Sequence, residues 1–165
     1  QYYYARELYY HGRYKEAVSL FQDFINAGQG WVEDVIGACQ LMAYCYYQLN
    51  EENAALWALL RSLEFDLPRG EFCCDIGKHF LDRNRLEQAV FWYEQAACAE
   101  LKPTGGFRTP DCYGFTPNIQ LCVCYDRLGD SLLAEEYNEK AARYKPDHPA
   151  VLANRTYFSN KKNQI

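Results

Sequence analysis

Long apolar runs are missing from this sequence. Nowhere do about 18 apolar residues follow one another, the length that a membrane-spanning helix needs, so no membrane span is predicted. No charged segment followed by an apolar one opens the chain, so no signal sequence is predicted either. The chain begins at Gln1 within a helical pattern, and we expect it to be part of a longer protein.

An excess of positive charge is also missing. The formal net charge is −5, and acidic and basic residues are interleaved along the chain. A nucleic-acid partner requires a concentrated basic face, because the protein must neutralise closely spaced phosphates. We therefore expect no nucleic-acid partner.

The usual signatures of catalytic and metal sites are absent from the sequence. The segment Cys73–His79 contains Cys, Asp and His side chains, but there is no Cys-x-x-Cys pair and no second compact pair of ligands to complete a zinc site. The acidic pair Glu51–Glu52 falls at a predicted turn, where carboxylates are solvated, whereas acid–base chemistry requires a dry cleft. We predict no catalytic residue, no metal site and no cofactor in this chain.

Cysteine, in contrast, is plentiful, with eight residues. Most of them fall on apolar faces of predicted helices, where a free thiol behaves as a small hydrophobic side chain. We interpret the set as reduced, which indicates a cytoplasmic chain. One alternative stays open: Cys112 lies near Arg108 in a loop, and Cys122 and Cys124 could join it in a redox centre.

The segment Phe72–Ala99 carries the pattern from which the fold is predicted. Its apolar and small residues recur at spacings of three and four, which predicts two helices joined by a turn at Asn84. Gly77 and Ala89 allow the two helices to approach closely, while Tyr93 fills the space beside them. A single hairpin of this size cannot bury its apolar face alone, so neighbouring copies are expected.

Three further copies of this size pattern are present. Moving back 34 residues from Gly77, then back 38 more, or moving forward 45, meets the same order of a small residue, a turn residue and a second small residue. These positions are Ala5, Gly12 and Ala17; Ala43, Asn50 and Ala55; Gly77, Asn84 and Ala89; and Cys122, Gly129 and Ala134. In the fourth copy the bulky position falls on Asn138, and we expect the neighbouring Tyr137 to fill that apolar slot instead.

The copies predict an all-α fold, a right-handed α-solenoid of about four helical hairpins closed by a C-terminal capping helix. We expect a single domain over residues 1–165. Its parts are hairpins at 1–28, 31–66, 69–100 and 118–145, an inserted loop at 101–117, and a capping helix at 149–160.

The inserted loop holds three prolines and three glycines between Lys102 and Pro117, which interrupts the helical pattern. A loop of this length in a compact domain is often functional. Its candidate ligand contacts are Phe107, Arg108, Tyr113 and Phe115. The alternative is that these side chains only pin the loop to the helices by packing.

A concave groove is expected where the first helices of stacked hairpins lie side by side. The predicted binding residues face away from the second helices and are Tyr2, Arg6, Tyr9, Tyr10, Gln40, Tyr44, Tyr47, Gln48, Lys78, Asp82, Asp126 and Arg127. Tyrosine supplies a large contact area and a hydroxyl at little cost in entropy. Glu71 and Cys74 fall on the same predicted face. The alternative is that several tyrosines only pack against neighbouring hairpins.

The order of small, aromatic and turn residues resembles the tetratricopeptide repeat, and the best match is Leu121–Pro149. Longer strings, GQGWVED, LPRGEFCCDIG and CYGFTPNIQLCVCYDRLGD, are similar to the tetratricopeptide-like C-terminal region of bacterial family-2 glycosyltransferases. This resemblance implies that a nucleotide-sugar and a divalent metal belong to a catalytic domain outside this chain. No Asp-x-Asp metal motif occurs here.

These observations lead to the expectation of a non-catalytic interaction module. Its groove would bind a protein or peptide segment, or a glycosylation acceptor presented to an attached transferase. One alternative is a domain that binds a carbohydrate or a nucleotide-sugar through the groove and the loop. Another is an oligomerisation module that forms a homodimer by stacking.

Overall fold

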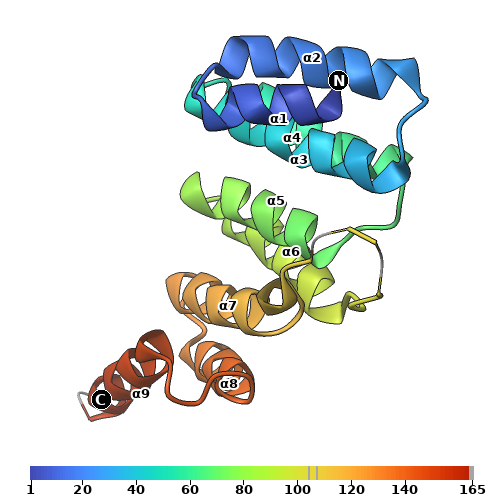
Figure 1. Cartoon of the computed structure of the whole chain (residues 1–165). Helices are drawn as coiled ribbons and strands as arrows, with labels where there is room; N and C mark the ends of the chain where they lie inside the picture. The colour runs from blue at the N-terminus through green and yellow to red at the C-terminus, as the bar shows by residue number, and fades with distance from the viewer. Residues whose placement is uncertain (104, 107, 164–165) are drawn as a thin grey trace. The chain divides into compact units, whose positions relative to one another are not determined.

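The computed structural model describes residues 1–103, 105–106 and 108–163, and within them the chain forms nine α-helices and two short 3-10 helices with no strand (Figure 1). The α-helices are α1 (Tyr2–Tyr10), α2 (Tyr14–Ala27), α3 (Val32–Gln48), α4 (Glu52–Arg61), α5 (Gly70–Asp82), α6 (Leu86–Cys98), α7 (Phe115–Arg127), α8 (Ser131–Ala142) and α9 (Pro149–Lys162). The 3-10 helices are η1 (Ser62–Glu64) and η2 (Pro110–Tyr113). The all-α prediction is confirmed.

The contacts divide the chain into two compact units. The first unit contains Gln1–Pro68 and Pro103–Phe107, and the second contains Arg69–Lys102 and Arg108–Ile165. In the first unit α1 packs on α2, α3 packs on α4, and α1 also contacts α3. In the second unit the same arrangement recurs with α5, α6, α7 and α8, and α9 packs on α8. The single continuous domain stays a prediction, because each unit is described here by itself.

The four hairpin turns have the same backbone geometry. Each turn residue adopts a positive φ: 73° at Gly12, 59° at Asn50, 55° at Asn84 and 88° at Gly129. Only glycine and asparagine adopt this left-handed conformation readily, which explains why these two residue types occupy the turn. The predicted turn positions are confirmed.

The hydrogen bonds of these turns repeat as well. In each hairpin the amide after the turn residue donates to the carbonyl five residues earlier, at 2.9 Å in all four cases. The pairs are Arg13 to Leu8, Glu51 to Tyr46, Arg85 to Phe80 and Asp130 to Tyr125. This bond satisfies a carbonyl at the end of the first helix that would otherwise lack a partner. The hairpins are therefore copies of one local structure.

The small positions of the pattern are all buried. Ala17, Ala55, Ala89 and Ala134 of the second helices are completely inaccessible, and so are Ala5 and Ala43 of the first helices. At Gly77 a β-carbon would lie 3.0 Å from three atoms of the Tyr93 ring, which is tighter than ordinary contact. The absence of a side chain at Gly77 therefore makes room for Tyr93, as the size pattern predicts.

The bulky slot of the fourth hairpin was assigned to the wrong residue by sequence reasoning. Asn138, not Tyr137, is fully buried there. Its Nδ2 donates to the Val151 carbonyl at 3.2 Å, and its Oδ1 accepts from Nδ2 of Asn154 at 2.9 Å. Because α9 supplies both partners, the polar side chain is satisfied inside the core. Tyr137 instead stacks on Tyr125, with ring centroids 5.3 Å apart.

Two helix boundaries differ from the expected ones. α7 begins at Phe115, so the end of the expected loop is already helical and Pro117 lies in the first turn. Proline is tolerated there because the first amides of a helix have no partner within it. α4 ends at Arg61 and continues as η1 to Glu64. The amide of Phe65 then closes the turn by donating to the Ser62 carbonyl at 3.1 Å.

Candidate functional site

The first unit carries a surface rich in tyrosine on α1 and α3. Its members are the predicted residues Tyr2, Arg6, Tyr9 and Tyr10 of α1 and Gln40, Tyr44, Tyr47 and Gln48 of α3. The two sets have identical internal spacing and lie 38 residues apart, which is also the offset between Ala5 and Ala43. They therefore occupy equivalent positions of two copies of the hairpin, on helices that contact each other. We call these eight residues the tyrosine surface.

Tyr2 anchors one end of the tyrosine surface. Its ring lies 6.2 Å from that of Phe21 and 5.7 Å from that of Phe24, both on α2. Its hydroxyl would lie only 2.7 Å from a β-carbon at Gly37, so the glycine lets α3 come close to this side chain. Burial is the largest cause that raises the pKa of Tyr2, followed by the charge of Asp34. Tyr2 is thus partly a packing residue.

Arg6 places a cation beside tyrosine rings. Its guanidinium carbon is 5.0 Å from the centroid of the Tyr3 ring and 6.0 Å from that of Tyr2. Such contacts are worth about 0.5 to 1 kcal/mol at exposed sites. They hold the guanidinium against the rings, so a partner meets a positive charge and aromatic edges together.

The remaining tyrosines offer unequal amounts of surface. Tyr10 is 66% exposed, whereas Tyr9 is half-buried against Tyr10 and Tyr14. Burial raises the pKa of Tyr9, so its hydroxyl remains protonated and able to donate at neutral pH. On α3, Gln40, Tyr44 and Tyr47 are half-buried and Gln48 is exposed. Surface for contact exists on both helices, while the concave groove itself stays a prediction.

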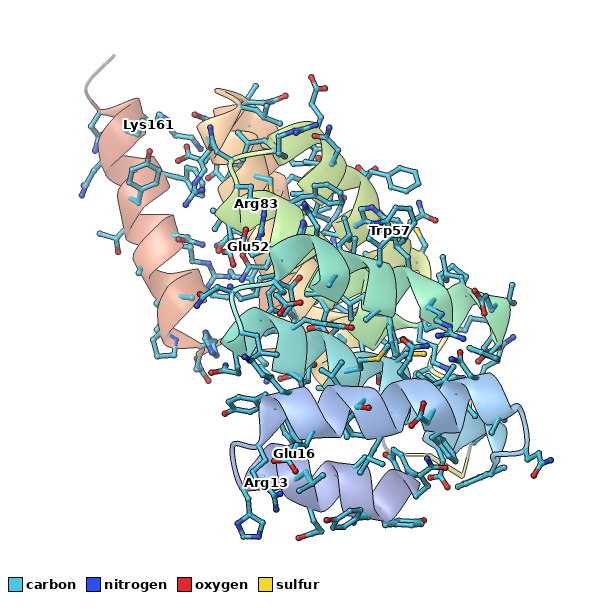
Figure 2. All side chains as sticks on the ribbon, turned by 90° about the horizontal axis from the view of Figure 1, so that it is seen from above. Arg13, Glu16, Glu52, Trp57, Arg83 and Lys161 are labelled. Atoms are coloured by element: carbon cyan, nitrogen blue, oxygen red, sulfur yellow. The ribbon has the colours of Figure 1, made fainter. Side chains whose placement is uncertain are left out.

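The predicted residues of the second unit are engaged within that unit. Lys78 and Asp82 form an exposed ion pair on α5 at 2.7 Å. Asp126 of α7 accepts from Lys161 of α9 at 2.9 Å and from the Tyr157 hydroxyl at 3.1 Å. Lys161 lies near the C-terminal end of α9 (Figure 2). The capping helix therefore binds Asp126, and Arg127 beside it is exposed.

Glu71 was expected on the open face, but the structure buries it. One carboxylate oxygen accepts from the Thr109 amide at 2.7 Å, and the other accepts from the Tyr113 hydroxyl at 2.6 Å. Arg108 lies 3.7 Å from the same carboxylate and donates to the Tyr113 hydroxyl at 3.2 Å. The charge of Glu71 is thus paired and hydrogen-bonded, as a buried carboxylate must be. Cys74 is buried as well, so both residues are lost to the predicted open face.

The candidate ligand residues of the loop have several different fates. Arg108 and Tyr113 belong to the Glu71 network, where burial and then the bond to Glu71 raise the pKa of Tyr113. Phe115 is 7% exposed and packs with Ile119 in a buried cluster. Phe107 lies outside the described residues. A ligand role for these residues stays a prediction, since the described contacts account for their positions by packing and pairing.

The buried network around Glu71 could not be inferred from the pattern of one helix. The signal lay in a long-range match: an acidic residue on an apolar helix face, and an arginine and a tyrosine 37 and 42 residues later in the loop. The suggested redox grouping of Cys112 with Cys122 and Cys124 also needs revision. Cys122 and Cys124 are buried, and burial raises the pKa of Cys122 to about 12 and that of Cys124 to about 11.

Two searches of the described part of the chain gave no candidate. Between residues 1 and 163, apart from 104 and 107, no group of three or more His, Cys, Asp or Glu side chains is placed to hold a metal ion. Over the same residues no helix combines the length and the apolar character that crossing a bilayer requires.

Solved structures with similar folds were found. MamA is 16% identical, with 96% of this chain and 84% of that chain covered at a TM-score of 0.75. The C-terminal part of a TPR repeat-containing protein from Cytophaga hutchinsonii is 18% identical, with coverage of 99% and 60% and a TM-score of 0.70. YrrB, a TPR protein with an unusual peptide-binding site, is 19% identical, with coverage of 94% and 73% and a TM-score of 0.68.

These similarities define the class of fold: the chain is a tetratricopeptide-like helical-repeat protein. At these levels of identity they establish the fold alone. No protein-family model and no curated protein matches the chain. The comparisons give no link to family-2 glycosyltransferases.

Proposed function

We propose that the chain is a non-catalytic interaction scaffold that binds an extended segment of a partner protein on the tyrosine surface. The observation that carries the proposal is the placement of the same set of polar and aromatic positions on two adjacent first helices of one unit. Binding would come from burial of a preorganised surface, which limits the entropy lost on association. The peptide-binding site described for YrrB, which has a similar fold, supports this class of partner.

The test uses peptides selected by display on the full chain and titrated calorimetrically. We expect Tyr44→Ala combined with Tyr47→Ala to weaken binding by tenfold or more, since large aromatic contacts dominate such interfaces. The matched control is Trp57→Ala: Trp57 is 72% exposed on α4, a second helix of the same unit (Figure 2). The control should leave affinity unchanged. Circular dichroism should show that both variants remain folded.

Two results would contradict this function. Equal affinities of the double variant and the wild type would remove the tyrosine surface as the binding site. Binding of glycans or nucleotide-sugars that shifts tyrosine resonances, without any peptide binding, would favour a carbohydrate-binding domain. A dimer in light scattering that the double variant abolishes would favour an oligomerisation module.

We also propose that the chain is the accessory region of a bacterial family-2 glycosyltransferase and helps to position its acceptor. This rests on the resemblance of the three strings quoted above and on the free thiols, which suit a cytoplasmic protein. The test is the sequence that precedes Gln1 in the gene. A nucleotide-sugar-dependent transferase domain with an Asp-x-Asp motif is expected there, and an unrelated domain would contradict the proposal.

A further inference from the structure

Two cysteines that are far apart in the sequence meet in the second unit, where η2 lies on α5. Cys74 belongs to α5 and Cys112 to η2. The Cys74 Sγ donates to the Cys112 carbonyl oxygen at 3.7 Å, and the two thiols are themselves within hydrogen-bond reach of each other. Cys74 is 6% exposed, whereas Cys112 is only half-buried. One thiol is therefore enclosed and the other is open to solvent.

The contact between the two thiols is fixed from both sides. Gly70 begins α5, and a β-carbon there would lie 2.7 Å from the Cys112 carbonyl oxygen and 3.0 Å from the Tyr113 ring. The glycine therefore permits η2 to lie directly on the helix. Glu71, in the next position, accepts from the Thr109 amide and the Tyr113 hydroxyl on either side of Cys112. These bonds hold the two cysteine backbones together without help from the thiols.

The two thiols differ in acidity. The hydrogen bond from Cys74 lowers the pKa of Cys112, although burial and the nearby carboxylates of Glu71, Asp75 and Asp111 oppose this. The same hydrogen bond, together with burial, raises the pKa of Cys74. The thiolate is the reactive form of cysteine, so the accessible member of the pair is also the more reactive one. The cation expected from the sequence, Arg108, does not contribute, because it pairs with Glu71.

We propose that Cys74 and Cys112 form an oxidation site, a dithiol that hydrogen peroxide converts into an intramolecular disulfide and that low-molecular-weight thiols reduce again. This goes beyond the proposed function and does not depend on it. An exposed thiol beside a second, resolving thiol is the arrangement found in redox-sensing pairs. The disulfide would covalently fix the second half of the inserted loop to α5.

The chemistry has two steps. The Cys112 thiolate attacks one oxygen of hydrogen peroxide, the O–O bond breaks, and the hydroxide that leaves takes up a proton to become water. This yields a sulfenic acid at Cys112. The Cys74 sulfur then attacks the Cys112 sulfur, the S–O bond breaks, and the hydroxide that leaves takes the Cys74 proton to become a second water. Overall, the two thiols lose two electrons and two protons, and peroxide is reduced to two waters.

The test is peptide mapping of the full chain after treatment with hydrogen peroxide, followed by alkylation of the remaining thiols and trypsin digestion. We expect a mass loss of ~2 Da and a disulfide between peptides 70–78 and 109–127, reversed by dithiothreitol. Fragmentation must place the bond, because the first peptide also contains Cys73 and the second contains Cys122 and Cys124. A bond from Cys73, or oxidation confined to the exposed Cys98, would overturn the proposal.

A pair of adjacent variants sharpens the assignment. Cys74→Ser should abolish the mass loss, while Cys73→Ser should retain it, although both residues are buried neighbours in one helix. Retention of the disulfide in Cys74→Ser would overturn the proposal. The wild-type map stands by itself if either variant fails to fold. If Cys112 in the wild type advances to sulfinic acid without forming the disulfide, Cys74 is not its resolving partner.

Discussion

Asn138 shows how a single polar residue can replace a hydrophobic one in a repeat. The equivalent bulky positions are Phe21, Leu59 and Tyr93, each buried against its own hairpin. An unpaired amide in such a position would be costly, because burial removes its bonds to water. Here Asn154 and the Val151 carbonyl, both from α9, satisfy it. The side chain thereby marks the hairpin that the capping helix must cover.

At the residue scale, we predict that Asn138→Ala lowers the free energy of unfolding of the second unit by about 1 to 3 kcal/mol, since two buried partners lose their bonds. The measurement is urea denaturation followed by circular dichroism. Asn160→Ala, at an exposed site on α9, is the matched control and should change stability by less than about 0.5 kcal/mol. An equally small effect of Asn138→Ala would show that the buried amide network contributes little.

The reach of sequence reasoning also becomes clear at single residues. The four turns could be predicted, since a positive φ restricts Gly12, Asn50, Asn84 and Gly129 to two residue types. Burial of Glu71 could not, because it depends on where a loop 38 residues away comes to lie. Local pattern carries information about a hairpin, whereas pairing across such a distance follows only from the assembled structure.

At the scale of elements, the loop between α6 and α7 is tied to α5 by polar contacts. η2 contacts α5, α6 and α7, and the Glu71 carboxylate receives two donors from the residues flanking it. A loop rich in proline and glycine has no ladder of its own, so side-chain bonds must supply its fixed position. The start of α7 at Phe115 was missed for a related reason: Pro117 suggests a loop but is also compatible with a first helical turn.

We predict that Tyr113→Phe loosens η2. The Glu71 carboxylate would lose its 2.6 Å donor, and a net cost of about 1 to 2 kcal/mol is expected. Hydrogen exchange of the Thr109 amide, which donates to the same carboxylate, should become roughly tenfold faster, in line with a loss of about 1.4 kcal/mol. Tyr144→Phe, at an exposed tyrosine of the second unit, is the control and should leave this amide unchanged. Equal exchange in both variants would show that the hydroxyl does not hold the loop.

At the scale of the whole molecule, the chain joins tetratricopeptide-like hairpins whose cores contain many thiols. Burial raises the pKa of Cys39, Cys73 and Cys122 to about 12 and that of Cys45 and Cys124 to about 11. In the unfolded chain a thiol ionises near a pKa of ~8.5. A pKa that is raised in the folded state means that stability is complete below the unfolded value and falls as the pH rises toward the folded value.

We therefore predict alkaline unfolding. Between pH 8 and pH 10 each of these five thiols should remove about 1 to 2 kcal/mol of stability, because the unfolded state loses protons that the folded state retains. The urea midpoint at pH 10 should lie well below that at pH 7, with little change between pH 6 and pH 7.5. A midpoint that stays constant up to pH 10 would mean that the thiols are more accessible than the structure indicates.

The central claim is that a partner segment lies on the tyrosine surface of α1 and α3. The most direct measurement is photo-crosslinking of a display-selected peptide to the full chain, with photoreactive benzoylphenylalanine placed at Tyr10 in one protein and at Trp57 in another. Both positions are exposed, at 66% and 72%, so the probes should be tolerated equally. The account predicts crosslinks from position 10 and none from position 57. Crosslinking from position 57 alone would contradict it.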